Sequence, residues 1–468
     1  MKILPFNFEF LDSDLAFLSN PAGFHEYLTR RELNELIHRN STGHSSKDEL
    51  LERKLFIVDT ESSQVAFSAL ASGMSKRLMK SLQFNPIFMI VPTLRCDHTC
   101  HYCQVSRASL RASDFDLDAT LIPQMLQQIR SLGNAPYKLE IQGGEPLLRF
   151  DLVQEIYSEA VSVLGLGKFE MIVATSLSLL NKDILSWSKD KAIHFSTSLD
   201  GSQLIHNSNR ILKEGNSFEL VRLGVERIRQ ELGEGRVATV TTVTDALLNH
   251  PEDIVSTHTD LGLSEMFIRP ISPYGFANTV KESTYDINEY MQFYEKLLTI
   301  LNQERLAGRS VVEHSALIHL KRVFSANYSG YADLKSPSGL ILNSILFNYD
   351  GRIFGSDEAR MLQKTNPNID FSLGTINEPN ISTNQLYKTV LSQSFSAVHP
   401  GCATCAYQPF CGADPCQNIS IFGEPIGDKS LSRFCQYHKA MFTLLLSHLS
   451  KEDSIGEMLK EWLYERCN

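Results

Sequence analysis

Cysteines gather in one short segment in the first quarter of the chain. The segment CDHTCHYC, residues 96–103, holds three of them: Cys96, Cys100 and Cys103. A structural zinc site closes its tetrahedron with four protein ligands, whereas a reactive metal site keeps one coordination position open. Three cysteines therefore suit three irons of a 4Fe-4S cluster whose fourth iron stays open for another ligand. The alternative is a zinc site that His98 or His101 completes.

A second group of cysteines lies near the C-terminus. Three follow the pattern CxxCx5C and a fourth comes later: Cys402, Cys405, Cys411 and Cys435. Four thiolates can close a zinc site or hold a further 4Fe-4S cluster, and the residues alone leave both open. The chain has nine cysteines, and clustering of this kind favours metal ligation over disulfides, which a reducing cytoplasm does not sustain.

Composition narrows the function classes. The 468 residues are 43% hydrophobic and carry a formal net charge of -10, which predicts a folded multidomain protein and argues against binding to nucleic acid or to an anionic membrane. Asp12 and Asp14 interrupt the region where a signal peptide would need its apolar core. The apolar run 442–449 is far shorter than the roughly 20 residues that span a bilayer. We therefore expect a cytoplasmic protein.

The elements that must position the first cysteine group follow an alternating strand and helix pattern. Six strands are expected, with amphipathic helical stretches between them: 86–91, 138–142, 169–175, 193–199, 237–243 and 265–271. Such repeats predict an α/β fold with a parallel sheet, open or closed as a partial (β/α)6 TIM-type barrel. Chemistry in such sheets lies at the carboxyl ends of the strands, and the cysteine loop follows the first strand.

The expected domain organisation has four parts: residues 1–84, 85–310, 311–445 and 446–468. The first is a small α+β unit of winged-helix-like composition, in which FLSNPAGFHEYLT predicts a hairpin and Thr29 with Glu32 a capping box. It either binds a peptide, by strand addition at the hairpin edge, or merely packs on the main domain. The second part is the barrel and ends after a helix, INEYMQFYEKLLTILNQERL. The third is cysteine-rich and contains a hairpin, ILFNYDGRIF; the last is a C-terminal helix.

The loop CDHTCHYC, with Tyr102 before its third cysteine, resembles the CxxxCxxC loop of radical S-adenosylmethionine (SAM) enzymes. QGGEPLL at 142–148 resembles the glycine-glycine-glutamate-proline motif of the same family. The resemblance implies that the open iron binds SAM and that reduction cleaves SAM to a 5'-deoxyadenosyl radical. It implies that Gly143 and Gly144 let the backbone approach the SAM methionine and that Glu145 accepts a hydrogen bond from its ammonium.

The fourth expected strand ends in STSLDGSQLIHNSNR, which resembles the SxDG and HDxxR segments of peptide-modifying members. The resemblance places Ser198 at the SAM ribose and Arg210 at its carboxylate, while Asn207 stands where relatives often have aspartate. The alternatives are that Asp200 caps the next helix and that Arg210 is a surface charge. The family's threonine-asparagine-glycine is replaced by TSL at 175–177. FIRPISPYGFA would lie beside adenine, unless its arginine, Arg269, belongs to the barrel rim.

The second cysteine group resembles the SPASM domain of radical SAM peptide maturases. By that resemblance the complete ligand set of one auxiliary 4Fe-4S cluster is Cys402, Cys405, Cys411 and Cys435. The ligand set of a second, inner cluster is missing, because Ser356 stands at the expected cysteine position and Cys416 comes one residue late. Cys416 is therefore expected to be free. Asp357 holds the position of the candidate catalytic base of sulfatase-maturing relatives, where burial would raise its pKa; otherwise it is a loop aspartate.

Over the whole chain the sequence most resembles the radical SAM maturase of the His-Xaa-Ser system. The resemblance rests on FLSNPAGFHEYLTRRE, RPISPYGFA, NYDGRIFGSDEARM and CATCAYQPFCGADP. It implies modification of a ribosomally made precursor peptide, a second, paired radical SAM maturase, and an electron donor such as flavodoxin or ferredoxin. The alternatives are a sulfatase-maturase-like or thioether-forming maturase, and a non-catalytic metal-stabilised scaffold that binds peptide.

Overall fold

The structure is a computed structural model, and it describes most of the chain. The described ranges are 1–38, 46–271, 274, 285–325, 334–336, 338–339, 342–366, 368–381 and 383–465. These residues form two compact units, each discontinuous in sequence. Unit 1 comprises Met1–Gln83, Ala316–Gly339 and Val390–Asn468, and unit 2 comprises Phe84–Ser315 and Leu340–Thr389.

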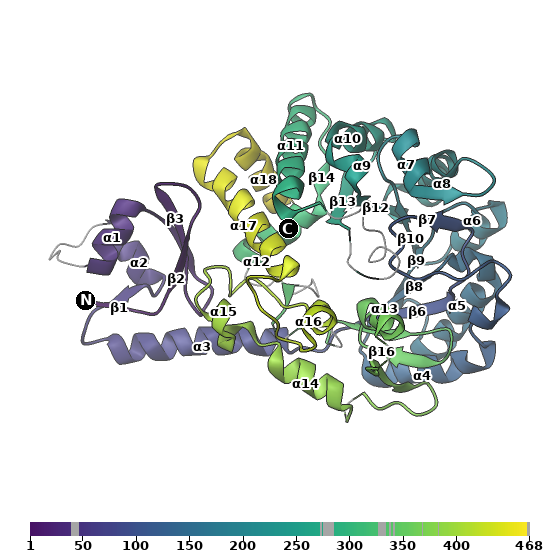
Figure 1. The fold of residues 1–468 in the computed structure, drawn as a ribbon, viewed down its shortest axis with the longest axis horizontal. Coiled ribbons are helices and arrows are strands. Elements are labelled where there is room, and N and C mark those ends of the chain that lie inside the picture. The colour runs from purple at the N-terminus through teal and green to yellow at the C-terminus, as the bar shows by residue number, and fades with distance from the viewer. Residues whose placement is uncertain are drawn as a thin grey trace. The chain divides into compact units, whose positions relative to one another are not determined.

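The N-terminal part of unit 1 is the predicted α+β segment (Figure 1, purple). Its strands are β1 (Lys2–Ile3), β2 (Asn7–Phe10), β3 (Leu15–Ser19), β4 (His25–Thr29) and β5 (Ile57–Val58), and its helices are α1 (Arg30–His38), α2 (Ser46–Arg53) and α3 (Ser63–Ser81). Strands β2, β3 and β4 form an antiparallel sheet. The predicted hairpin is confirmed as β3–β4. The capping box is confirmed too: Glu32 accepts from the Thr29 backbone N–H, and the Glu32 N–H donates to the Thr29 hydroxyl.

The remainder of unit 1 is helical, and two of its helices cross the boundary between the units. The helices are α12 (His314–Phe324), α14 (Gln385–Gln393), α15 (Pro400–Ala403), α16 (Pro415–Phe422), α17 (Arg433–Lys451) and α18 (Ser454–Glu465). Ser432 caps α17, because its side chain accepts from the Cys435 backbone N–H at 3.3 Å. The cap holds this cysteine in the first turn of the helix.

Unit 2 is built on a mixed sheet, which has ten strands among the described residues, in the order β14-β13-β12-β10-β9-β8-β6-β15-β16-β17. The bounds are β6 (Ile87–Thr93), β8 (Tyr137–Gly143), β9 (Phe169–Ala174), β10 (Ile193–Ser198), β12 (Val237–Val243), β13 (Glu265–Pro270), β14 (Val312–Glu313), β15 (Ser344–Phe347), β16 (Arg352–Phe354) and β17 (Ser372–Thr375). The six strands from β6 to β13 in this order are the predicted ones, and they pair in parallel. Closure of these strands as a partial barrel stays a prediction.

A hairpin extends the sheet beyond the predicted strands. β15 pairs in parallel with β6 and antiparallel with β16, so the predicted ILFNYDGRIF hairpin is confirmed and joins the same sheet. Its turn includes Gly351 at φ +80°, a conformation that glycine adopts without steric cost. The chain that follows this hairpin is thereby brought to the strand that precedes the cysteine loop.

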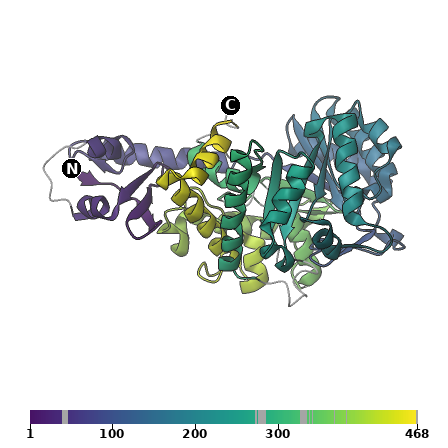
Figure 2. The same ribbon diagram turned by 90° about the horizontal axis from the view of Figure 1, so that it is seen from above.

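The helices of unit 2 cover one face of the sheet, around the outer side of the strands in Figures 1 and 2. They are α4 (Ile122–Leu132), α5 (Phe150–Leu164), α6 (Lys182–Ser188), α7 (Gln203–Asn209), α8 (Ser217–Leu232), α9 (Asp245–Leu248), α10 (Pro251–Asp260) and α11 (Ile287–Leu306). Helix α13 (Asp357–Thr365) lies instead on the opposite face. Strand β8 shows how the two faces differ. Leu139 and Ile141 are fully buried in the shared core, whereas Glu140 and Gln142 alternate with them and point to the opposite face.

Two sequence features lie wholly or partly outside the described residues. Of the segment RPISPYGFA, residues 272–273 and 275–277 are not described, and Cys467 also lies beyond the described range. Among the residues that are described, none of the helices has the length and apolar character that a membrane crossing requires.

Candidate functional site

A cavity of about 260 Å³ opens at the carboxyl ends of the parallel strands in unit 2. The structure brings all the predicted residues of the first site into its lining: Cys96, Cys100, Tyr102, Cys103, Gly143, Gly144, Glu145, Ser198, Arg210 and Asp357. These residues lie far apart in the sequence. They meet in space because neighbouring strands of a parallel sheet end at the same edge. The placement is thus established, while the role of each residue remains a prediction.

The cysteine loop is held by a short antiparallel ladder of two strands, which the sequence did not predict. Strand β7 (His98–Cys100) pairs antiparallel with β11 (Arg210–Leu212), with Cys100 opposite Arg210. Further along the loop, the His101 backbone N–H donates to the Asn209 carbonyl at 3.1 Å. The ladder therefore fixes the cysteine loop and the predicted carboxylate-binding arginine in one register.

The two glycines of the GGE turn are required by the protein's own backbone. A Cβ on Gly144 would lie 2.1 Å from the Arg95 carbonyl oxygen and 2.5 Å from that of Leu94. A Cβ on Gly143, which has φ +141°, would lie 2.3 Å from the Thr93 carbonyl oxygen. The turn therefore packs directly against the segment that leads into Cys96, in addition to lining the cavity.

Glu145 is a buried carboxylate with a full set of protein donors. Its Oε1 accepts from the Thr175 hydroxyl at 2.7 Å and the Leu147 N–H at 3.0 Å, and its Oε2 accepts from the Ser176 hydroxyl at 2.7 Å and N–H at 2.8 Å. Burial raises the pKa of Glu145, and the bonds from Ser176 and Thr175 act in the opposite direction. The prediction that it accepts from the SAM ammonium requires a hydroxyl to turn away. Thr175 and Ser176, noted from sequence only because the segment TSL stands where relatives have threonine-asparagine-glycine, hold this carboxylate.

Tyr102 links two further predicted residues. Its hydroxyl donates to Asp200 Oδ2 and accepts from Arg210 Nη1 at 2.6 Å. Asp200 is fully buried, and burial raises its pKa. The following helix takes Ser202 as its N-cap, so Asp200 is not the cap residue. Arg210 lines the cavity and carries a buried Nε without an acceptor among the described residues, which is not the environment of a surface charge.

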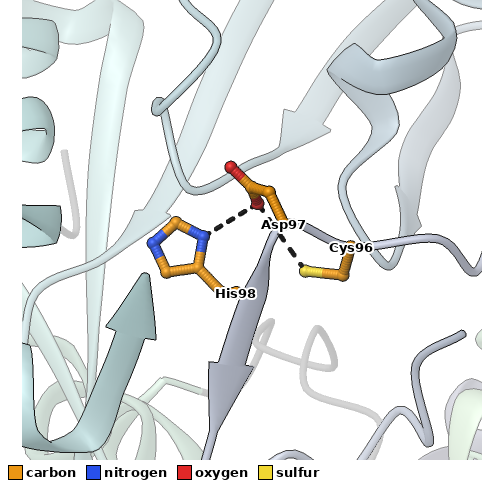
Figure 3. A group of neighbouring side chains, drawn as sticks. All are labelled: Cys96, Asp97 and His98. Carbon is orange, nitrogen blue, oxygen red and sulfur yellow. Dashed lines mark hydrogen bonds and ion pairs between the residues drawn. The ribbon is translucent and has the colours of Figure 1, made fainter. Parts of the chain in front are cut away.

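The residue proposed as an alternative zinc ligand is engaged elsewhere. Asp97 lies between Cys96 and His98 in Figure 3, with its Oδ1 2.8 Å from the His98 Nδ1 and 3.9 Å from the Cys96 Sγ. The Nε2 of His98 lies 2.9 Å from the Ser217 hydroxyl. Both ring nitrogens of His98 therefore have partners, and a zinc site that His98 completes would have to break one of these bonds. The alternative with His101 is not tested by these contacts.

Asp357 and its neighbours form the first turn of α13. Ser356, at the position where relatives have the inner-cluster cysteine, is the N-cap and accepts from the Ala359 N–H at 3.2 Å. Arg360 donates to Asp357 Oδ1 from Nε at 2.9 Å and from Nη2 at 2.7 Å. The predicted base is therefore paired with an arginine, a partner that the sequence prediction did not include. Its role stays a prediction.

The four C-terminal cysteines also meet, in unit 1. They line a small cavity of about 30 Å³: Cys402, Cys405, Cys411 and Cys435. Burial raises the pKa of Cys402 to about 11 and that of Cys411 further. Buried thiols of this kind need a bound cation to favour their thiolate form. Cys416 is buried on α16.

The N-terminal sheet contacts this second cysteine group within unit 1. The Asn7 side-chain amide donates to the carbonyl oxygens of Ala403 at 2.8 Å and Cys405 at 3.3 Å. Lys439, which lines the cavity, forms an ion pair with Glu9 at 2.9 Å. The α+β segment therefore contacts and supports the loop that carries Cys402 and Cys405.

The donor sets match the groups that the sequence predicts. Three thiols in the larger cavity leave one position of a cluster open, and the unsatisfied Arg210 Nε offers a donor to an anionic group beside them. Four thiols in the smaller cavity suit a closed site. The residues present therefore fit SAM with one 4Fe-4S cluster at the first site and a second metal group at the other.

Part of the cavity-bearing unit matches a known family. Residues 90–258 match the model of the Radical SAM superfamily. An uncharacterized protein of Methanocaldococcus jannaschii is 26% identical over 112 residues, which are 24% of this chain and 37% of that protein, so the chain spans just over a third of the relative's length.

Two solved structures share the fold. The structure of anSMEcpe with bound AdoMet is similar with a TM-score of 0.63 at 16% identity, covering 78% of this chain and 99% of that one. Streptococcus suis SuiB bound to its precursor peptide SuiA is similar with a TM-score of 0.55 at 13% identity, covering 93% and 100% of the two chains. The chain thus matches the Radical SAM superfamily over residues 90–258, and its α/β fold with a large mixed sheet is similar to the folds of these two structures.

Proposed function

We propose that this protein is a radical SAM enzyme that modifies a ribosomally made precursor peptide. The observation that carries the proposal is the single cavity into which the three-cysteine loop, the GGE turn, Ser198 and Arg210 converge. These residues come from the carboxyl ends of three strands, β6, β8 and β10, and from β11, and a site of mere structural metal ligation does not need them. The bound cluster and SAM would supply the reductive cleavage that yields the hydrogen-abstracting radical.

The chain's own residues would bind and orient SAM. Arg210, fixed opposite Cys100 by the β7–β11 ladder and by the Tyr102 hydroxyl, would pair with the carboxylate of SAM. Ser198 at the end of β10 would contact the ribose. Glu145 would accept a hydrogen bond from the ammonium once one of its two hydroxyl donors rotates away.

The peptide substrate is proposed from the likeness to SuiB, whose structure holds a precursor peptide, and to anSMEcpe, which has also been solved with a bound peptide. The sequence resemblance to the His-Xaa-Ser maturase favours a precursor of that repeat type. A sulfatase-maturase-like or thioether-forming reaction on a peptide is the second candidate. The sulfatase-maturase-like reaction and thioether formation each remove two hydrogens from the peptide. Mass spectrometry distinguishes them, because only a crosslinked peptide resists alkylation and fragments differently.

The second cysteine group is proposed to bind one auxiliary 4Fe-4S cluster. Its four thiols supply a closed ligand set, which suits electron transfer or structural support. We further propose a flavodoxin or ferredoxin as the electron donor, a paired radical SAM maturase as a partner, and a cytoplasmic location.

Anaerobic reconstitution tests the proposal. The protein, loaded with iron and sulfide and reduced with dithionite, is expected to cleave SAM to 5'-deoxyadenosine. Cys96→Ala should abolish the cleavage, and Cys416→Ala is the matched control that should retain it. Iron-loaded, reduced protein that leaves SAM intact would refute the enzyme and favour a metal-stabilised scaffold.

A further inference from the structure

The cavity of unit 2 contains three carboxyl groups among the described residues, and they differ in what binds them. The three are Glu140, Glu145 and Asp357. Glu145 accepts four hydrogen bonds from the protein, and Asp357 accepts two from Arg360. Glu140 makes no hydrogen bond or ion pair within the described part of the chain. A proton acceptor needs an oxygen that is free to bind substrate. Both bonds from Arg360 end on Asp357 Oδ1, so among the three it is Glu140 that has, within the described residues, both oxygens without a protein partner and no cation paired with it.

The strand fixes where Glu140 points. Its neighbours Leu139 and Ile141 are fully buried in the core, so the period of two along β8 turns Glu140 to the cavity face. In register it lies opposite Met89 of β6 and Ile172 of β9, neither of which is charged. Gln142, two residues on along the same face, leads directly into the GGE turn. Glu140 therefore stands below the predicted SAM site on a rigid element.

Charges around the cavity explain how this carboxyl would behave. The charged side chains that face the cavity with it are Arg107, Glu145, Arg210, Arg269 and Asp357. Burial, together with the negative charge of Asp357, raises the pKa of Glu140 to about 7, and Arg269 acts in the opposite direction. A carboxyl poised near neutral pH has the basicity that general base catalysis favours.

We propose that Glu140 is the general base of the reaction, accepting a proton from an O–H, N–H or S–H group of the bound peptide. This rests on the proposed peptide-modifying function. In the step the peptide X–H bond breaks, its electron pair remains on the heteroatom, and the proton forms an O–H bond with a Glu140 carboxylate oxygen. Asp357, held by Arg360, then acts as the charge that keeps Glu140 protonatable near neutral pH.

The test compares Glu140→Gln, Glu140→Asp and Asp357→Asn in the reduced holoenzyme, with peptide carrying deuterium on carbon. Glu140→Gln should still cleave SAM and transfer deuterium to 5'-deoxyadenosine, while modified peptide falls by about 10² to 10⁴-fold. Glu140→Asp should recover part of the loss. If the base were Asp357, the losses would be reversed between Glu140→Gln and Asp357→Asn, and that result overturns the assignment.

The pH profile supplies a second arm. Because the base must be ionised, peptide modification should rise with pH through a value near 7, and Glu140→Gln should lose this rise. Asp357→Asn should move the rise to lower pH, because a negative charge that raises the pKa of Glu140 has been removed.

A readout without SAM separates failure of this inference from failure of the proposed function. In the purified protein, isotope-edited infrared spectroscopy should show one glutamic acid carboxyl titrating near neutral pH, absent in Glu140→Gln. If that signal is the same in both proteins, Glu140 is not the base, whatever the protein does with SAM.

Discussion

Substitution of Gly144 by alanine should disable the SAM site through the backbone alone. The added Cβ would lie 2.1 Å from the Arg95 carbonyl oxygen, against 3.4 Å for ordinary contact. The turn and the segment leading to Cys96 must then separate by about 1.3 Å (3.4 minus 2.1), which breaks the 2.8 Å bond from the Glu145 N–H to the same carbonyl. Overpacking of this size costs about 1–3 kcal/mol, and a displacement near 1 Å at a reactive site lowers turnover about 100-fold.

The assay measures iron and sulfide per chain, 5'-deoxyadenosine formation and unfolding by urea for the wild type, Gly144→Ala and Gly235→Ala. Gly235 is the matched control, because a Cβ there meets nothing within 4 Å. We expect Gly235→Ala to match the wild type in all three measurements. If Gly144→Ala forms 5'-deoxyadenosine at the wild-type rate, the close approach between the turn and the cysteine segment does not position the cluster.

Three further predictions concern other parts of the chain. Asn7→Ala removes two hydrogen bonds to the second cysteine loop, worth about 1 kcal/mol each. A chelator should then remove the proposed auxiliary metal faster from this variant than from the control Asn34→Ala. Equal rates of removal would contradict the view that Asn7 supports the loop. Cys435→Ala should spare SAM binding, measured by calorimetry, yet impair peptide turnover; undiminished turnover would rule out an auxiliary role. Burial lowers the pKa of His258 to about 4 from an ordinary 6.5, so on acidification the unfolded chain takes up a proton at this site before the folded chain does. The free energy of unfolding is therefore unaffected by His258 above pH 6.5 and decreases by about 3 kcal/mol as the pH falls towards 4. Urea unfolding of His258→Gln should show a weaker loss over that interval; an unchanged pH dependence would refute it.

Local patterns in the sequence sufficed to predict most elements of unit 2. The six strands have unbroken apolar or alternating runs, and α11 begins at a capping box formed by Asp286 and Glu289. The hairpin at Gly351 carried its own turn signal. What these patterns do not contain is pairing over long separations. The extension of the sheet by β15–β17 and the β7–β11 ladder both join segments far apart along the chain, and no local periodicity specifies such partners.

The candidate site shows the same division. Motif spacing brought out the three cysteines and the GGE turn, because metal ligation and tight turns depend on residue type at fixed spacing. Spacing does not reveal the environment of each carboxyl. It singles out Asp357, as a base or a loop aspartate, but does not contain its partner Arg360. Glu140 looks like an ordinary alternating polar residue of its strand. The alternation along β8 does place Glu140 on the same face as Gln142, which directly precedes the GGE turn, and this pattern could have marked Glu140 as a candidate.

The most direct test of the account is deuterium transfer from substrate. A small protein encoded beside this gene, deuterated on carbon, is incubated anaerobically with the reduced holoenzyme and SAM, and both products are analysed by mass spectrometry. The account predicts 5'-deoxyadenosine that carries deuterium and a peptide that has lost mass at one residue, neither of which Cys96→Ala produces. Unlabelled 5'-deoxyadenosine together with an unchanged peptide would contradict it.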